Sequence, residues 1–415
     1  MSLAEGVQAR ISYKAYATGA IDSNTQPASG TDPGASGAQI VRRVSSSLNL
    51  TKDTYQSNEI RDDRQIADFR HGTKRVTGSI TGEFSPSTYW DFFEASCRGT
   101  AGTAVTIDQS DLTTLSADHS TSKFTAAAGD PVALGLRVGD IFRATSLSDS
   151  DNNTKNFIIL SFGGTSNREI TVFPAPDTMS ADNGFSLSTI GQTLYIPSTN
   201  FVSRKFGIEE YNEDIDIARL FTECRAAGFT LNLPATGMAT CEFPFMGRDM
   251  EVYEASNAPF YTSPTAETGT GIFAAVNGLL RVNGAVQGVV TGISITMNLA
   301  PSSDAVVGQD FVPEVFLGSA NITGQVTALF ENADLINNFV DEDEIDILVY
   351  LTTTSAVDTP AATIYLPRVK FGAANVATQG MGAQSITMPF QALKYTGSAA
   401  GVVQTTIRFA DTQAS

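Results

Sequence analysis

The chain is poor in the side chains that carry most protein chemistry. Its 415 residues include two His, three Cys and one Trp. His71 and His119 lie near no repeated Asp, Ser or Cys pattern, so the sequence offers no evident general base and predicts no enzyme. Cys97, Cys224 and Cys241 are odd in number and lack metal-ligand spacing, which predicts reduced, buried thiols instead of a disulfide framework. We therefore expect no catalytic residue, no metal and no cofactor.

Long apolar runs and positive charge are also scarce. No apolar run approaches the roughly 20 residues of a membrane helix, and the first six residues do not begin a signal peptide. We therefore expect a protein of the cytosol that binds no membrane. Lys and Arg number 26 against 44 Asp and Glu, a net charge of −18. This charge argues against tight nucleic-acid binding, which depends on neutralising phosphates, but an acidic surface would let DNA slide past without sticking.

One segment of the chain occurs twice. Residues 76–84 align without gaps with residues 322–330 at a constant offset (322 − 76 = 246). In both copies apolar residues or glycine occupy alternate positions, the period of a half-buried strand. A helix signal follows each strand, with Ser85-Pro86 as the first cap and Asn332 as the second. At the same offset the helix residues Tyr89, Trp90 and Phe93 correspond to Leu335, Ile336 and Phe339. A repeated strand and helix predict a duplicated domain.

Weaker matches flank this repeat. Residues 48–50 (Leu-Asn-Leu) correspond to residues 297–299 (Met-Asn-Leu) at an offset of 249 (297 − 48 = 249). Pro244-Phe245 corresponds to Pro389-Phe390 at an offset of 145 (389 − 244 = 145). The fall in offset from 246 to 145 places about a hundred extra residues in the first half. Those residues are enough for a domain of their own.

A competing alignment gives a smaller insertion. It pairs residues 193–197 with residues 363–367, an offset of 170, and leaves about 76 extra residues (246 − 170 = 76). Either way the insertion is domain-sized, and we place it at residues 98–198. Short apolar runs with a Gly163-Gly164 turn predict a small β barrel or sandwich, with residues 146–156 as an exposed polar loop.

The predicted fold is therefore mainly β. It has two tandem β-sandwich or barrel domains, each with a flanking helix, plus a small inserted β domain. The predicted boundaries are residues 1–39 for an N-terminal segment and flexible arm, 40–97 and 199–254 for the first domain, 98–198 for the insertion, 255–275 for a linker, and 276–415 for the second domain.

Each of two charged clusters can be interpreted either as an ordinary solvated surface loop or as a functional surface. Asp341, Glu342, Asp343 and Glu344 follow the second predicted helix. They form a solvated loop or, if they face a channel, repel DNA phosphates. Arg61, Asp62, Asp63 and Arg64 form a self-compensated exposed loop or an interface patch. We favour the interface, because the surrounding connecting segment is repeated and otherwise polar.

Four stretches of the sequence resemble the major tail tube proteins of long-tailed bacteriophages. They are residues 45–95, 205–210 (Lys-Phe-Gly-Ile-Glu-Glu), 229–234 (Phe-Thr-Leu-Asn-Leu-Pro) and 243–247 (Phe-Pro-Phe-Met-Gly). The resemblance implies a β sandwich or barrel flanked by a helix, with six copies in a ring and rings stacked into a tube. Duplicated members of this family form trimeric rings, so three chains would here supply six barrels (3 × 2 = 6).

The resemblance also implies a structural role and a set of partners. The connecting loops 52–71 and 301–317 would reach a neighbouring ring, which makes Arg61, Asp62, Asp63, Arg64, Asp310 and Glu314 the candidate stacking residues. Asp341, Glu342, Asp343 and Glu344 are candidates for an acidic lumen. We expect the insertion to lie outside the tube, because it would block the lumen.

The expected partners are other copies of the chain and the tape measure, tail terminator and baseplate or tip proteins, with transient, non-specific passage of double-stranded DNA. The expected location is the virion tail, after assembly in the host bacterial cytoplasm. The alternative is a capsid or tail decoration protein or a carbohydrate-binding surface protein. Trp90, on an apolar helix face, supplies little for sugar stacking.

Overall fold

The computed structural model describes residues 4–16, 33–60, 62–63, 65–274, 278–286, 290–331, 333–356, 358–377 and 383–414. The chain is mainly β, as predicted, and its strands form one network of 20 strands and a separate sheet of eight. The predicted strands at residues 76–84 and 322–330 are confirmed, within β5 and β23. All three cysteines are free and buried, as expected, and burial raises the pKa of each thiol.

The first half of the chain contributes eleven elements around the insertion. They are β1 (Ala9–Ala15), β2 (Gln39–Ile40), β3 (Ser45–Ser46), β4 (Asn49–Gln56), β5 (Phe69–Glu83), α1 (Trp90–Cys97), β15 (Phe206–Asn212), β16 (Ile217–Ala226), β17 (Gly228–Pro234), β18 (Thr240–Gly247) and β19 (Asp249–Glu254). In space β1, β15, β16 and β19 follow one another, and β16 also pairs with β18, which continues to β5 and β4.

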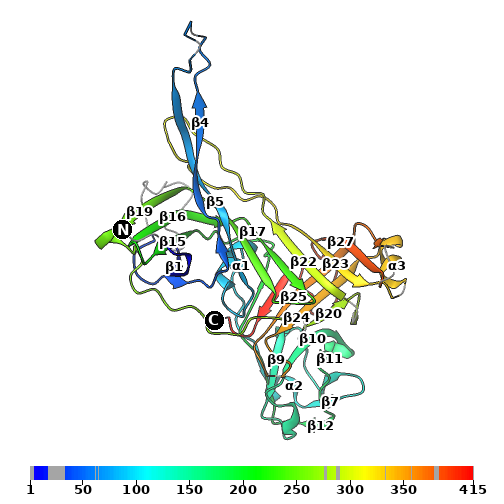
Figure 1. Ribbon diagram of the computed structural model, residues 1–415. Helices are drawn as coiled ribbons and strands as arrows, with labels where there is room; N and C mark the ends of the chain where they lie inside the picture. The colour runs from blue at the N-terminus through cyan, green and yellow to red at the C-terminus, as the bar shows by residue number, and fades with distance from the viewer. Residues whose placement is uncertain are drawn as a thin grey trace.

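The second half contributes ten elements. They are β20 (Leu279–Val282), β21 (Ala285–Val286), β22 (Val290–Asn298), β23 (Asn321–Leu329), α3 (Asp334–Val340), β24 (Ile345–Thr352), β25 (Ala361–Phe371), β26 (Asn375–Ala377), β27 (Ser385–Ala392) and β28 (Arg408–Asp411). The pairing of β17 with β22 joins the two halves into one sheet (Figure 1).

The two halves pair their strands in the same register. In the first half Ser79 of β5 lies opposite Pro244 of β18, and in the second Gln325 of β23 lies opposite Pro389 of β27. The offsets are 246 (325 − 79) and 145 (389 − 244), those of the sequence alignment. The strand pair β15–β16 likewise matches β24–β25, including one irregularity near the start of β15 and of β24.

This register rejects the competing alignment of residues 193–197 with 363–367. In the first half Leu220 of β16 lies opposite Glu209 of β15. At the same place in the second half Tyr365 of β25 lies opposite Leu348 of β24. Tyr365 therefore corresponds to Leu220. Residues 192–195 instead form β14 (Gln192–Tyr195), which lies on the other side of β28 from β25. The strands β14 and β25 thus have similar sequences and share the partner strand β28.

The 249-residue offset of the flanking match is also wrong, by two residues. Leu50 lies opposite Val76, and Met297 lies opposite Ile322, so the structural offset is 247 (297 − 50). A slip of two residues leaves every side chain on the same face of a strand, so the apolar pattern could not detect it.

The N-terminal strand belongs to the first half. Tyr13 of β1 lies opposite Ile208 of β15, as Val282 of β20 lies opposite Ile347 of β24. A two-residue turn joins β20 to β21, whereas residues 16–38 join β1 to β2. Most of the predicted flexible arm, residues 17–32, lies outside the described residues.

The first helix, α1, begins later than expected. The Ser85 hydroxyl pairs with the Thr88 hydroxyl at 2.6 Å instead of capping α1, whose first residue follows Tyr89 without a side-chain cap. Asn332, the predicted second cap, lies outside the described residues. The apolar face of α1 nevertheless packs as predicted, with the Phe93 ring 5.0–5.2 Å from the rings of Phe229 and Phe243.

The eight-stranded sheet spans residues 106–189 and has its own apolar core. Its elements are β6 (Thr106–Asp108), α2 (Gln109–Leu112), β7 (Leu115–Asp118), β8 (Lys123–Ala126), β9 (Ile141–Thr145), β10 (Asn156–Gly163), β11 (Glu169–Phe173), β12 (Met179–Asp182) and β13 (Ser186–Thr189). It packs against the second half, where the Thr363 hydroxyl donates to the Gly139 carbonyl at 2.6 Å. The 146–156 loop is not wholly exposed as expected, because Asn152 and Asn156 are buried and donate to backbone carbonyls.

Candidate assembly surface

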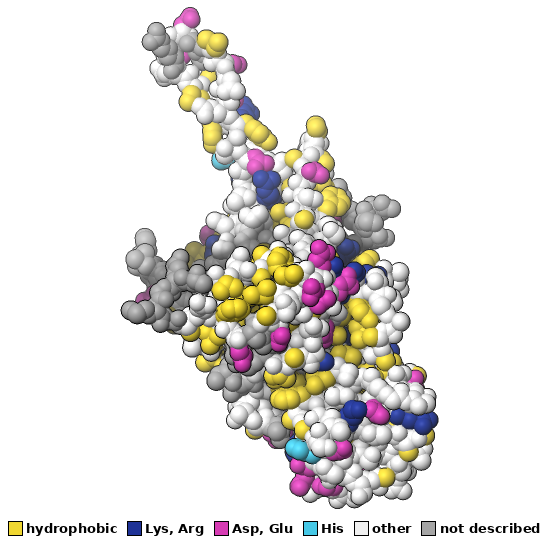
Figure 2. All heavy atoms as spheres, turned by 90° about the vertical axis from the view of Figure 1, so that its right-hand side faces the viewer, with side chains coloured by type: hydrophobic (Ala, Val, Ile, Leu, Met, Phe, Trp, Pro, Cys, Tyr) yellow, Lys and Arg dark blue, Asp and Glu magenta, His cyan; other side chains and the backbone are white. Residues whose placement is uncertain are grey.

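A long hairpin of β4 and β5 projects from the body of the molecule (Figure 1). Tyr55, Ile60, Ile66 and Phe69 near its end are more than half exposed. Figure 2 shows hydrophobic side chains along this projection. A two-stranded ribbon buries no core of its own, so exposed apolar side chains at its end suit contact with another molecule.

The predicted stacking cluster lies at the end of this hairpin. Asp62 and Asp63 are exposed there, and Arg61 and Arg64 lie outside the described residues. Asp62 and Asp63 lie in the connection between β4, which ends at Gln56, and β5, which begins at Phe69.

The second predicted loop, residues 301–317, runs along the base of the hairpin. The Lys74 amide donates to the Asp310 carbonyl at 2.8 Å, and the Lys74 ammonium lies 3.6 Å from the Asp310 carboxylate. The Arg248 guanidinium lies 4.1 Å from the centre of the Phe311 ring. A segment of the second half is thus held against strands of the first, while Val307 on the same segment is fully exposed.

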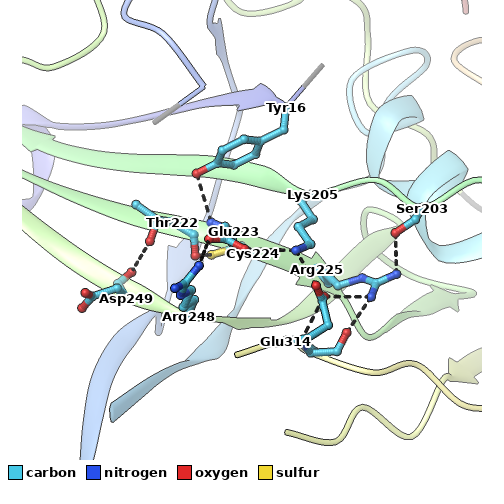
Figure 3. A network of polar contacts seen from close by, with 11 residues as sticks. Tyr16, Ser203, Lys205, Thr222, Glu223, Cys224, Arg225, Arg248, Asp249 and Glu314 are labelled. Carbon is cyan, nitrogen blue, oxygen red and sulfur yellow. Dashed lines mark hydrogen bonds and ion pairs between the residues drawn. The ribbon is translucent and has the colours of Figure 1, made fainter. Parts of the chain in front are cut away.

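A buried network of ion pairs fastens this segment (Figure 3). Glu223 lies 3.0 Å from the Lys205 ammonium and 2.7 Å from the Arg248 guanidinium. Glu314, from the 301–317 segment, lies 2.7 Å from Lys205 and 3.2 Å from Arg225. Lys205, Glu223 and Arg248 are each less than 10% exposed, so each charge depends on its partners in place of water.

The network defines what Glu314 does in this chain. Glu314 was predicted to contact a neighbouring ring, and the structure places its carboxylate on Lys205 and Arg225 of the same chain. Arg225 also donates to the Ser203 hydroxyl at 2.6 Å and to the Val315 carbonyl at 2.5 Å. Burial lowers the pKa of Arg225, and Glu314 opposes that shift.

The acidic cluster after α3 is exposed at all four positions, Asp341, Glu342, Asp343 and Glu344. Glu344 accepts two hydrogen bonds from Arg368, at 2.8 and 2.6 Å, and these lower the pKa of Glu344. Figure 2, which faces α3, shows acidic and hydrophobic side chains beside one another on this side.

The Glu344–Arg368 pair is the counterpart of the buried Lys205–Glu223 pair with the charges exchanged. Lys205 and Glu344 each precede the first residue of matched strands, β15 and β24. Phe206 pairs with Cys224 in the first half, and Ile345 pairs with Val369 at the same place in the second. Glu223 directly precedes Cys224, and Arg368 directly precedes Val369. Glu223 and Arg368 therefore also correspond. One buried pair is covered by the 301–317 segment, and its counterpart is open to solvent.

The sequence does not indicate that Lys205, Glu223, Arg225 and Arg248 form a group. Glu223 and Arg225 lie in a mostly apolar run at residues 220–229, and charges in such a run are a signal of buried pairing. Their partners come from positions 18–109 residues away in sequence, which no local pattern indicates.

In the part of the chain that the structure describes, no group of His, Cys, Asp and Glu could hold a metal ion. None of the described helices has the length and apolar composition needed to cross a membrane. The feature that distinguishes this surface is the projecting hairpin of β4 and β5.

The comparison with protein families agrees with these features. The family model for phage tail tube proteins matches residues 6–392. A search of curated proteins finds no match. Because the family match spans more than nine-tenths of the sequence, the chain belongs to the phage tail tube protein family.

Proposed function

We propose that this chain contains two copies of the tail tube domain and that three chains form a ring of six domains. Stacked rings then build the tube of a long, siphovirus-like tail, through which genome DNA passes into the host. Membership of the phage tail tube family already makes the protein a structural component of the virion tail. The proposal adds the duplication, the ring and the conduit.

The equal strand registers carry the proposal. Each of the strand pairs β1–β15, β15–β16, β16–β18, β18–β5 and β5–β4 has a partner pair in the second half, with matched residues at constant offsets. Loop lengths differ widely between the halves, so a common register is best explained by one domain present twice. A fused pair of neighbours halves the number of association steps and raises their effective concentration.

The hairpin β4–β5 and the 301–317 segment are proposed to make the contacts between rings. Both carry exposed apolar side chains, including Ile60 and Val307, and both lie at matched places in the two halves. In this arrangement Asp62, Asp63 and Asp310 lie near the contact, and Glu314 holds its segment in position from within the chain. Arg61 and Arg64 complete the proposed contact.

The net charge of −18 suits a conduit that DNA crosses without binding. Asp341, Glu342 and Asp343 are the proposed lumen residues, with Glu344 tied to Arg368. The inserted sheet would decorate the tube exterior. Tape measure, tail terminator and baseplate or tip proteins are the proposed partners, and the host cytoplasm is the proposed site of assembly.

Electron microscopy of the purified protein tests this function. We expect hollow tubes of stacked rings at high concentration. A variant with residues 57–68 replaced by an Asn-Gly turn should form rings that do not stack, because it lacks the end of the hairpin. The control replaces the exposed Ser120-Thr121 turn of the inserted sheet by Asn-Gly and should keep its tubes.

Two results would contradict the proposal. A wild-type chain that stays monomeric at every concentration, even beside tail initiator proteins, would favour the decoration or carbohydrate-binding alternative. Normal tubes from the shortened hairpin would remove the hairpin from ring stacking. Trp90 is buried in this chain, so its indole is not available to stack on a sugar.

A further inference from the structure

Among the described residues, two sheet edges have no pairing strand at positions whose counterparts are paired. In the first half β17 lies between β18 and β22. Its counterpart β26 pairs with β27 alone among the described strands. Likewise β22 lies between β17 and β23, whereas its counterparts β3 and β4 pair with β5 alone in the described part of the chain.

The counterparts are fixed residue by residue. Leu231 lies opposite Cys241, and Val376 lies opposite Ile386, so β17 and β26 correspond at an offset of 145 (376 − 231). The strands β3 and β4 correspond to β22 at an offset of 247. The pairing of β17 with β22 inside the chain therefore specifies a matching pairing of β26 with β3 and β4.

We propose that successive chains of the ring join edge to edge, with β26 of one chain antiparallel to β3 and β4 of the next. Within the chain Thr230 lies opposite Thr296. Applying the offsets (230 + 145 = 375; 296 − 247 = 49) places Asn375 opposite Asn49 of the next chain. By the same rule Val376 lies opposite Leu48, and Ala374 opposite Leu50. The occupant of each open edge is a second copy of this chain.

The backbone of the β4 edge is suited to this partner. The Ser47 amide donates to a β5 carbonyl at 2.9 Å, so the amides of Leu48 and Leu50 point to the open edge, because amides alternate along a strand. In the single chain these two amides donate to nearby side chains. The Leu48 amide donates to Ser46 Oγ at 3.3 Å, and the Leu50 amide donates to Asn49 Oδ1 at 2.9 Å. A strand placed there would replace these contacts with a ladder of backbone hydrogen bonds.

The side chains also match. Leu231 and Ile295, the intrachain counterparts of Val376 and Leu48, are both fully buried. Leu48 is buried and Val376 half-buried against the same core, so pairing would complete an apolar contact between chains. The Thr230 and Thr296 hydroxyls lie 3.3 Å apart, and Asn375 and Asn49 would place two amides, which can hydrogen-bond to each other, at the equivalent position.

Because a chain carries one edge of each kind, the contact is head-to-tail. A head-to-tail contact generates a closed ring or an open helix, depending on the rotation between subunits. This inference rests on the proposed tube architecture and assigns the contact that closes its ring.

Disulfide trapping tests the register. Asn49 and Asn375 would form a non-hydrogen-bonded antiparallel pair with Cα atoms about 4.5 Å apart, within the range of a disulfide. The double variant N49C/N375C, assembled and then mildly oxidised, should give covalent dimers and trimers on non-reducing gels. A mixture of the two single variants should stop at dimers, and each single variant should stay monomeric.

The matched control is S45C/N375C, which moves one thiol four residues along the exposed edge, roughly 13 Å away, and should not cross-link. Equal cross-linking of both pairs would overturn the register. Rings or tubes seen by microscopy without a 49–375 cross-link would overturn this inference and leave the proposed function standing. If the cysteine variants misfold, hydrogen exchange of the wild-type Leu48 and Leu50 amides should slow by at least tenfold on assembly, and unchanged exchange would contradict the pairing.

Discussion

The buried charges beneath the 301–317 segment each have a partner of opposite sign. Lys205, Glu223 and Arg248 are almost fully buried and form a continuous network with Arg225 and Glu314. The matched pair in the second half, Glu344 and Arg368, is exposed and therefore contributes little to stability. The same strand positions thus serve as an anchor in one half and as a solvated pair in the other.

Asp411 makes the stability of the chain depend on pH. It is buried, and burial raises its pKa from 3.8 to about 6, although the Ser87 and Gln413 amides donate to it and oppose the shift. A carboxyl with a raised folded-state pKa stabilises the fold below its unfolded pKa, and this stabilisation is lost as pH rises through about 6. The free energy of unfolding of the wild type, relative to Asp411→Asn, should therefore fall by about 2 kcal/mol between pH 4 and pH 7.5.

Urea unfolding of both proteins at the two pH values measures this difference. Asn does not titrate, so its own effect on the free energy of unfolding is the same at both pH values. That effect cancels when the wild-type-minus-variant differences at pH 4 and pH 7.5 are compared. Asp62→Asn, on the exposed hairpin, controls for the loss of one charge. A wild-type-minus-variant difference that is the same at pH 4 and pH 7.5 would show that Asp411 keeps an ordinary pKa.

At the scale of single elements, two matched glycines set how closely the central strands approach. A Cβ at Gly324 of β23 would lie 2.2 Å from Cζ of Phe390 and 2.3 Å from the Ser294 carbonyl oxygen. A Cβ at its counterpart Gly78 of β5 would lie 2.5 Å from the Ser47 carbonyl oxygen, and the φ of Gly78 is +148°. Neither strand therefore has room for a side chain at this position. The Phe390 ring and the Ser294 carbonyl fill the space at Gly324, and the backbone of residues 47–48 fills it at Gly78.

We expect Gly324→Ala to lower the free energy of unfolding by about 1–3 kcal/mol, because the Phe390 ring or the β22 backbone must move. Urea denaturation monitored by circular dichroism checks this. Gly269→Ala is the control, since a Cβ at Gly269 would meet nothing within 4 Å. An alanine tolerated equally at both positions would refute the close approach of β22, β23 and β27.

At the scale of the whole molecule, net charge should oppose the proposed assembly of chains into rings, and apolar contact should favour it. Every chain carries a net charge of −18, so neighbouring chains repel one another at low ionic strength. Raising salt from about 0.01 M to about 1 M shortens the screening length from roughly 30 Å to roughly 3 Å. The concentration at which rings and tubes appear should fall at least severalfold over this range.

Light scattering and sedimentation across a salt series measure that threshold concentration. Sucrose at matched osmolality separates screening from water activity. A threshold that rises with salt would mean that attractive ion pairs between chains dominate the contacts.

The sequence alone determined the strand-rich class and the repeated strand at residues 76–84 and 322–330. These features are local: alternation of side chains along a strand needs no knowledge of its neighbours. Only the tertiary structure decided which alignment was right, because Tyr365 and Tyr195 share a sequence pattern but occupy different places around β28. It also decided that β1 belongs to the first half and that Glu314 pairs with Lys205 and Arg225. Those contacts join residues up to about 200 positions apart, so they follow from how the sheets pair and not from any nearby sequence.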